Sequence, residues 1–225
     1  MKTNSFFFSH STLLILLLAG MPPRAEAQNF VIGARVMPVI ANMQLQSESG
    51  YAIKGRADAG VGAAGFVGYQ FSPLFGIQAE IQVSSFGLRY EEQGVTRKVN
   101  LQYVQIPVML ALNTGRNRLV NLNIVAGPQV GVNTGSSLRI SGADSNTPVA
   151  ILGVRKGDVG LAYGGGLDVG VNRDRTVRLG VGYRGAMGIL NIGKSNTSLA
   201  PDTFLIANKT RVRTHAIYLE AAFAF

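Results

Sequence analysis

The sequence predicts an all-β fold: an eight-stranded antiparallel up-and-down transmembrane β-barrel, preceded by a cleavable signal peptide. Apolar and polar residues alternate with a period of two along nearly the whole chain after residue 28. Mean hydropathy is positive, at +0.21, and 15% of residues are charged. The longest later apolar run, Ile106 to Leu112, is interrupted by Pro107. Because a spanning helix needs about 20 apolar residues, a membrane crossing here has to be made by strands.

The N-terminal segment has the features of a secretory signal peptide. Lys2 supplies a positive charge, Leu13 to Ala19 is an apolar run, and Ala25-Glu26-Ala27 offers a small-x-small cleavage pattern. The run is too short for the alternative, a transmembrane anchor. We expect residues 1–27 to be removed by cleavage between Ala27 and Gln28, which leaves residues 28–225 as one barrel domain.

The alternation after the signal peptide divides into eight strands. They are expected at 29–41, 58–72, 74–87, 98–112, 118–132, 158–171, 176–190 and 211–225. Short connections fall near 72–73, 113–117 and 172–175, and long ones at 42–57, 88–97, 133–157 and 191–210. Short turns on one side and long loops on the other are typical of outer-membrane barrels, with the long loops outside the cell.

The bulky apolar face of these strands is expected to point into lipid. Val177, Leu179 and Val181 alternate with inward residues that include Arg178 and Arg184. The inward face is otherwise mostly Gly, Ala and Gln, and small residues suit the crowded interior of an eight-stranded barrel. A soluble lipocalin-like barrel would have the opposite arrangement, with its apolar residues inside.

Aromatic residues gather near both ends of the apolar face, as in the girdles that lie at two membrane interfaces. The expected girdle residues are Phe30, Tyr69, Phe71, Phe75, Phe223 and Phe225 near the short turns, and Tyr103, Tyr163 and Tyr183 further along their strands. Phe225 ends an alternating apolar strand. We expect it to act as the signal that the barrel-assembly machinery of the outer membrane recognises.

Five inward charges fall at similar distances from the short-turn side: Arg35, Glu80, Asp168, Arg178 and Glu220. Arg35 and Glu220 should be neighbours when the barrel closes, and Asp168 and Arg178 should face each other across a hairpin. Charges inside a narrow barrel have to be paired or hydrated. We therefore expect one ion-pair layer that fills the lumen, with Arg184 above it. A proton or ion pathway is the alternative.

Two further features carry weaker expectations. Gly188 to Ser195 fits the phosphate-binding P-loop pattern, but residues 196–201 have loop composition where a P-loop requires a helix, so no nucleotide binding is expected. His215 is the only histidine after the signal peptide, and no Ser and carboxylate are evident beside it for a lipid A deacylase. With no Cys in the chain, we expect no catalytic residue, no cofactor and no metal site.

Four segments carry a family resemblance. They are Phe75-Gly76-Ile77-Gln78-Ala79-Glu80, Leu101-Gln102-Tyr103-Val104-Gln105-Ile106-Pro107, Ala126-Gly127-Pro128-Gln129 and Gly180-Val181-Gly182-Tyr183-Arg184. In this order and spacing they resemble the PorT-type outer-membrane β-barrel family, over essentially the entire chain after the signal peptide. The resemblance implies an eight-stranded outer-membrane barrel. It implies little about activity, because one member takes part in a secretion and gliding system and most others have no assigned role.

The function expected from these observations is a structural or interaction role in the cell outer membrane, exercised through the extracellular loops, and not catalysis. The net charge of +9 favours outer-membrane lipid and lipopolysaccharide as partners over nucleic acid, and protein partners at the loops are further candidates. The alternatives are a narrow porin-like channel, an accessory component of a secretion system as in PorT, and a lipid A-modifying enzyme.

Overall fold

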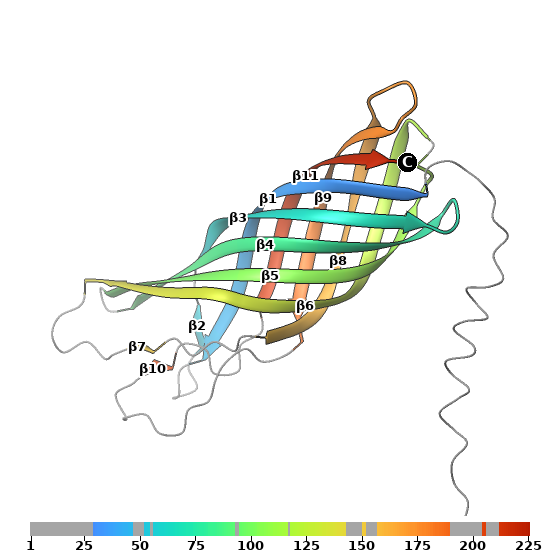
Figure 1. Cartoon of the computed structure of the whole chain (residues 1–225). Helices are drawn as coiled ribbons and strands as arrows, with labels where there is room; N and C mark the ends of the chain where they lie inside the picture. Colours follow the sequence, from blue (N-terminus) through green and yellow to red (C-terminus); the bar gives the residue numbers. More distant parts are fainter. Residues whose placement is uncertain are drawn as a thin grey trace, which may run out of the picture.

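The computed structural model describes residues 29–46, 52–54, 56–92, 95–116, 118–142, 150–151, 157–189, 204–205 and 212–225 (Figure 1). Eight of the strands in these ranges form a closed antiparallel barrel, in the order β11-β9-β8-β6-β5-β4-β3-β1, and β1 pairs with β11 to close it. The predicted fold class is confirmed. The predicted signal peptide and its cleavage point between Ala27 and Gln28 lie outside the described residues.

The barrel strands are β1 (Phe30–Gln46), β3 (Arg56–Gln70), β4 (Phe75–Glu92), β5 (Val95–Asn113), β6 (Val120–Ser141), β8 (Gly157–Gly170), β9 (Val177–Gly188) and β11 (Val212–Ala224). Three shorter strands lie in connections that the sequence predicts as loops: β2 (Ala52–Lys54), β7 (Ala150–Ile151) and β10 (Phe204–Leu205). β2 pairs with the end of β1, and β7 pairs with β10.

The short turns 71–74, 114–119 and 171–176 lie at one end of the barrel, and the C-terminus lies at the same end (Figure 1). In the turn between β8 and β9, the side chain of Asn172 accepts a hydrogen bond from the backbone N–H of Val177 at 3.0 Å and donates one to Thr176 at 2.7 Å. At the closing seam, two backbone hydrogen bonds of 3.0 and 2.9 Å join Phe30 and Phe225.

The apolar face points outward, as predicted. Leu179 and Val181 on β9 are 52% and 46% exposed, whereas Arg178 and Arg184 on the same strand are only 1% and 3% exposed. Outward Val, Leu and Ile side chains recur on every barrel strand, while polar and charged side chains such as Arg35, Glu80 and Asp168 lie inside. This is the polarity that a hydrocarbon surround requires, and it is the reverse of a soluble barrel.

Three strands continue well past the barrel at the end opposite the short turns. Figure 1 shows β4, β5 and β6 extending together beyond the other strands. The prediction of loops at 88–97 and at the start of 133–157 is therefore wrong, since β4 runs to Glu92, β5 starts at Val95 and β6 runs to Ser141. The outward residues of these two stretches are polar or charged, such as Arg89, Ser137 and Arg139, so the lipid-facing alternation that identifies a strand is lost.

Within the described ranges, no helix is long and apolar enough to cross a membrane.

Candidate functional site

The lumen is filled at mid-height by a buried charge cluster. The Glu80 carboxylate of β4 accepts hydrogen bonds from Arg35 of β1 and Arg184 of β9, and from the Gln78 amide at 2.6 Å. Arg35 also donates to Glu220 of β11, at 2.7 Å. We call Arg35, Glu80, Arg184 and Glu220 the mid-lumen cluster. It contains two guanidinium and two carboxylate groups, so its charges balance, as burial requires.

Two aromatic rings hold Arg35 from either side. Its guanidinium carbon lies 4.1 Å from the ring centroid of Phe66 and 4.5 Å from that of Tyr218. Such cation–π contacts strengthen when water is excluded. The rings fit because glycines face them: a Cβ on Gly33 would lie 2.5 Å from the Phe66 ring, and one on Gly166 would lie 2.4 Å from the Tyr218 hydroxyl. The inward glycines therefore make room for the aromatic residues that fix the cluster.

A second layer of polar contacts lies in the lumen at the short-turn end. Arg178 forms an ion pair with Asp168 and also donates to the backbone carbonyls of Arg116 at 2.7 Å and Arg118 at 3.2 Å, in the turn 114–119. Asn121 donates to Asp168 at 2.8 Å. The Arg116 side chain is half-buried beside this layer, and desolvation lowers the pKa of its guanidinium from the ordinary arginine value.

The ion pairs divide the five predicted lumen charges into two sets, and Arg184 is bonded to one of these sets. Arg35 and Glu220 are paired, as are Asp168 and Arg178, but the two pairs belong to different layers. Arg184 bonds to Glu80 and is part of the mid-lumen cluster. The lumen therefore holds two sets of ion pairs where one layer was predicted, and the height of Arg184 relative to them stays a prediction.

The tilt of the strands explains the difference. Rows of paired residues run perpendicular to the strands, so with strands about 4.8 Å apart and tilted by about 40°, each step to the next strand changes the height by about 3 Å. The row from Arg35 passes through Glu220 and Gly180 to Asp168, three strands away, which lowers Asp168 by about 9 Å. Counting residues along single strands misses this stagger.

Above the cluster, the lumen is lined partly by apolar residues. Tyr103 is only 2% exposed and stacks on Phe86 with ring centroids 5.7 Å apart. Its assignment to the outer aromatic girdle is therefore wrong. Ile106, Val108 and Leu110 point outward on β5, so unbroken alternation along this strand places the odd-numbered Tyr103 inside. A cavity beside it is lined by Asp158, Gln105 and Thr214.

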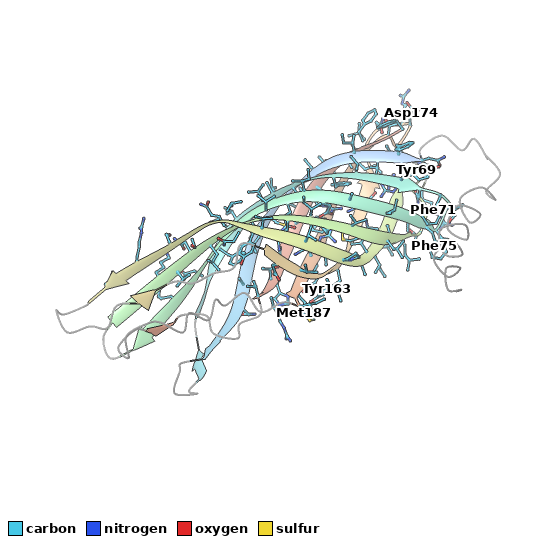
Figure 2. The ribbon with its side chains drawn as sticks, turned by 60° about the horizontal axis from the view of Figure 1, so that its bottom comes forward. Tyr69, Phe71, Phe75, Tyr163, Asp174 and Met187 are labelled. Carbon is cyan, nitrogen blue, oxygen red and sulfur yellow. The ribbon has the colours of Figure 1, made fainter. Side chains whose placement is uncertain are left out.

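The other expected girdle residues lie on the outer surface. All six expected girdle residues near the short turns are exposed: Phe30, Tyr69, Phe71, Phe75, Phe223 and Phe225. The ring centroid of Phe30 lies 4.8 Å from that of Tyr69 and 6.2 Å from that of Phe225. Figure 2 shows Tyr69, Phe71 and Phe75 projecting at this end, with Tyr163 further along the outside of the barrel. The ring centroids of Tyr163 and Tyr183 lie 6.3 Å apart.

His215 lies beside this upper aromatic pair. Its Nδ1 is 2.5 Å from the Tyr183 hydroxyl on the outside of the barrel. Among the described residues, no three His, Asp or Glu side chains are grouped so that they could hold a metal ion. Most of the P-loop-like segment, from residue 190 onward, lies outside the described residues.

Several lumen residues were missed by sequence reasoning: Phe66, Gln78, Met109, Asn121 and Tyr218 all lie inside. The sequence did contain a signal for them. On a strand, successive side chains point to opposite faces, and each of these residues has outward apolar neighbours on its own strand, so it has to point inward. Bulky side chains such as Met109, whose sulfur lies 3.0 Å from Nη1 of Arg184, were not expected in a lumen predicted to hold mainly small residues.

Comparison with known proteins gives a consistent result. The family model described as outer membrane protein beta-barrel domain matches residues 26–193, and no curated protein sequence matches the chain. The solid-state NMR structure of the outer membrane protein AlkL in lipid bilayers has a TM-score of 0.54 and 13% identity, covering 100% of this chain and 97% of that one. Neisserial surface protein A has a TM-score of 0.48 and 18% identity, covering 89% and 99%. Ail of Yersinia pestis has a TM-score of 0.39 and 13% identity, covering 88% and 100%.

Proposed function

The chain belongs to the outer membrane protein beta-barrel domain family, and on that premise we propose that it is a non-conducting, non-enzymatic barrel with a structural or interaction role. Its extracellular loops and the extension of β4, β5 and β6 would present the contacts, and the barrel would anchor them in the outer membrane. The filled lumen is the observation that carries this proposal.

A channel needs a continuous hydrated path, and three contacts oppose one here. The Arg35 guanidinium is sandwiched between Phe66 and Tyr218. Glu80 of β4 binds Arg35 of β1 and also Arg184 of β9, the strand directly across the lumen. Below them, Arg178 spans from Asp168 to the backbone of the turn 114–119. An ion that moved through would have to displace two successive layers of buried, mutually neutralised charges, each costly to separate.

Conductance across a planar bilayer tests the proposal directly. The wild-type barrel is expected to give no discrete current steps in concentrated KCl, whereas Arg35→Ala with Glu220→Ala removes two side chains that fill the mid-lumen and should produce them. Asp174→Asn, in an exposed turn, is the matched control and should leave the baseline unchanged. Steady wild-type steps that Arg35→Ala alone abolishes would instead establish the narrow porin-like channel.

A separate experiment tests whether this protein is an enzyme that modifies lipid A. His215→Ala is expected to leave the chemical structure of lipid A unchanged, because His215 contacts Tyr183 on the outer surface. Analysis of lipid A by mass spectrometry from cells with each form makes the comparison. A modification that disappears only in the variant would replace the non-enzymatic proposal.

The resemblance to PorT-type barrels makes an accessory role in secretion the alternative within the same class. A strain that lacks the gene for this barrel tests the accessory role. The amount of secreted protein should stay at the wild-type level if the barrel is structural. A loss of secretion that the intact barrel restores would favour the PorT-like role.

A further inference from the structure

A row of basic residues crosses the extension of the barrel from strand to strand. The register pairs Arg56 of β3 with Arg89 of β4, Arg89 with Lys98 of β5, and Lys98 with Arg139 of β6. Directly paired residues on neighbouring strands lie about 5 Å apart at their Cβ atoms and share one face of the sheet. We call Arg89, Lys98 and Arg139 the basic row, with Arg56 at its β3 end by register.

The basic row is on the outer face of the sheet. On β5, the inward Val99 and Leu101 are almost fully buried, and Lys98 alternates with them. The Arg89 and Lys98 side chains are 43% and 40% exposed, and Arg139 is exposed. A bulge between Gln102 and Tyr103 in the pairing of β5 with β6 brings Arg139 opposite Lys98, so without this irregularity the row would be interrupted.

Like charges placed directly opposite each other destabilise a sheet, and among the side chains that the structure describes one carboxylate lies within ion-pair distance of this row. Asp58 of β3 lies 2.9 Å from the Lys98 ammonium and 3.7 Å from the Arg89 guanidinium. One carboxylate thus serves two cations, while the register continues the row to Arg139 on one side and Arg56 on the other. An arrangement with this excess of positive charge is complementary to several closely spaced anionic groups.

The height of the basic row above the lipid limits what those anions are. The last apolar row of the outer face contains Val83, Val104 and Val132, which are paired with one another. Lys98 lies six residues beyond Val104 on β5, so with a rise of about 3.3 Å per residue and a tilt of about 40°, the row stands about 15 Å above the end of the apolar face. Phospholipid headgroups extend only about 5 to 8 Å from the hydrocarbon.

We propose that the basic row binds phosphate groups on the sugar headgroup of a glycolipid in the surrounding outer leaflet. This inference rests on the proposed function, and it names a partner and a site for it. The row faces sideways from the barrel, over the apolar face that contacts hydrocarbon, so a neighbour embedded in the same membrane meets it directly. A sugar headgroup reaches the required height, which a simple phospholipid headgroup does not.

The test compares two variants with the same loss of charge. Arg89→Gln with Arg139→Gln removes two cations and keeps the close ion pair of Lys98 with Asp58, which protects folding. Arg118→Gln with Arg173→Gln removes two exposed cations near the short turns at the other end of the barrel. Heat-modifiable mobility on gels establishes that both variants are folded before binding is measured.

Binding to purified lipopolysaccharide is measured on the folded barrel in a zwitterionic detergent. The Arg89→Gln, Arg139→Gln variant is expected to bind about 30-fold more weakly than the wild type, since each basic side chain at an anionic surface contributes about fivefold. The control variant should stay within about twofold. Enzymatic removal of the sugar phosphates should weaken wild-type binding to the level of the variant. Added salt should also weaken the binding of the wild type to intact lipopolysaccharide.

Three results would overturn the inference. The first is equal loss of binding in the two variants, which would indicate net charge rather than a site. The second is binding of phosphatidylglycerol as tight as that of lipopolysaccharide and equally sensitive to Arg89→Gln, Arg139→Gln. The third is tighter binding of a soluble sulfated polysaccharide with the same sensitivity, which would make the partner a polymer outside the membrane. A barrel that conducts ions but passes this test would refute the proposed function and leave the site standing.

Discussion

Glu80 is the residue on which the mid-lumen cluster depends, and Glu80→Gln is the sharpest test of it. The substitution keeps the size of the side chain and removes one negative charge. Arg35 still has Glu220 at 2.7 Å. For Arg184, the contacts recorded among the described residues are with Glu80 and the Met109 sulfur, so it loses its carboxylate partner.

The expected cost follows from the burial of these groups. The side chains of Glu80 and Arg184 are 0% and 4% exposed, so solvent screening cannot compensate for the lost charge. Breaking a buried ion pair by removing one partner costs about 3 to 5 kcal/mol, because the other charge stays buried and unneutralised. Glu80→Gln should lower the free energy of unfolding by that amount. Asp174→Asn in an exposed turn should change it by less than about 1 kcal/mol.

Urea unfolding of the barrel refolded in lipid vesicles, followed by intrinsic fluorescence and gel mobility, measures both values. Glu80→Gln combined with Arg184→Met is expected to recover more than half of the loss, since replacing both ions by uncharged groups leaves no unpaired charge. A loss below about 1 kcal/mol in Glu80→Gln, or no recovery in the double variant, would refute the view that the cluster stabilises the barrel by charge neutralisation.

Three further predictions follow from the same geometry. Val181→Arg on the outer surface should destabilise the barrel in lipid by about 2 to 4 kcal/mol, which urea titration measures, and a loss near zero would place Val181 outside the hydrocarbon. Gly166→Ala should cost about 1 to 3 kcal/mol, because its Cβ would meet the Tyr218 hydroxyl at 2.4 Å; Gly166→Ala with Tyr218→Phe should recover part of it, and unchanged stability would show that the lumen is less closely packed. The chain has no Trp, so Tyr103→Trp and Tyr183→Trp each introduce a single tryptophan that can be excited selectively over tyrosine. Brominated lipid should quench the outer Tyr183→Trp strongly and the inner Tyr103→Trp weakly, and equal quenching would contradict the assigned faces.

The sequence by itself determined where the barrel strands cross the lipid and which side of each strand meets it. Alternation with a period of two identifies a strand and its two faces locally, and a shift by one residue would move every apolar side chain to the wrong face. Val181, Arg178 and the short turns could therefore be assigned without any knowledge of neighbouring strands. The rule was misapplied at Tyr103, whose odd-numbered position places it inside, and it missed the extension of β4, β5 and β6, where the outward face is no longer apolar.

Only the tertiary structure decided which inward and outward residues meet. The contact between Arg184 and Glu80, the separate layer of Asp168 and Arg178, and the alignment of Arg89, Lys98 and Arg139 depend on the register between strands. Register is fixed by the tilt, the closure of the barrel and irregularities such as the one at Gln102 and Tyr103. None of these leaves a mark on the pattern within a single strand, because each is a relation between residues that lie far apart in the chain.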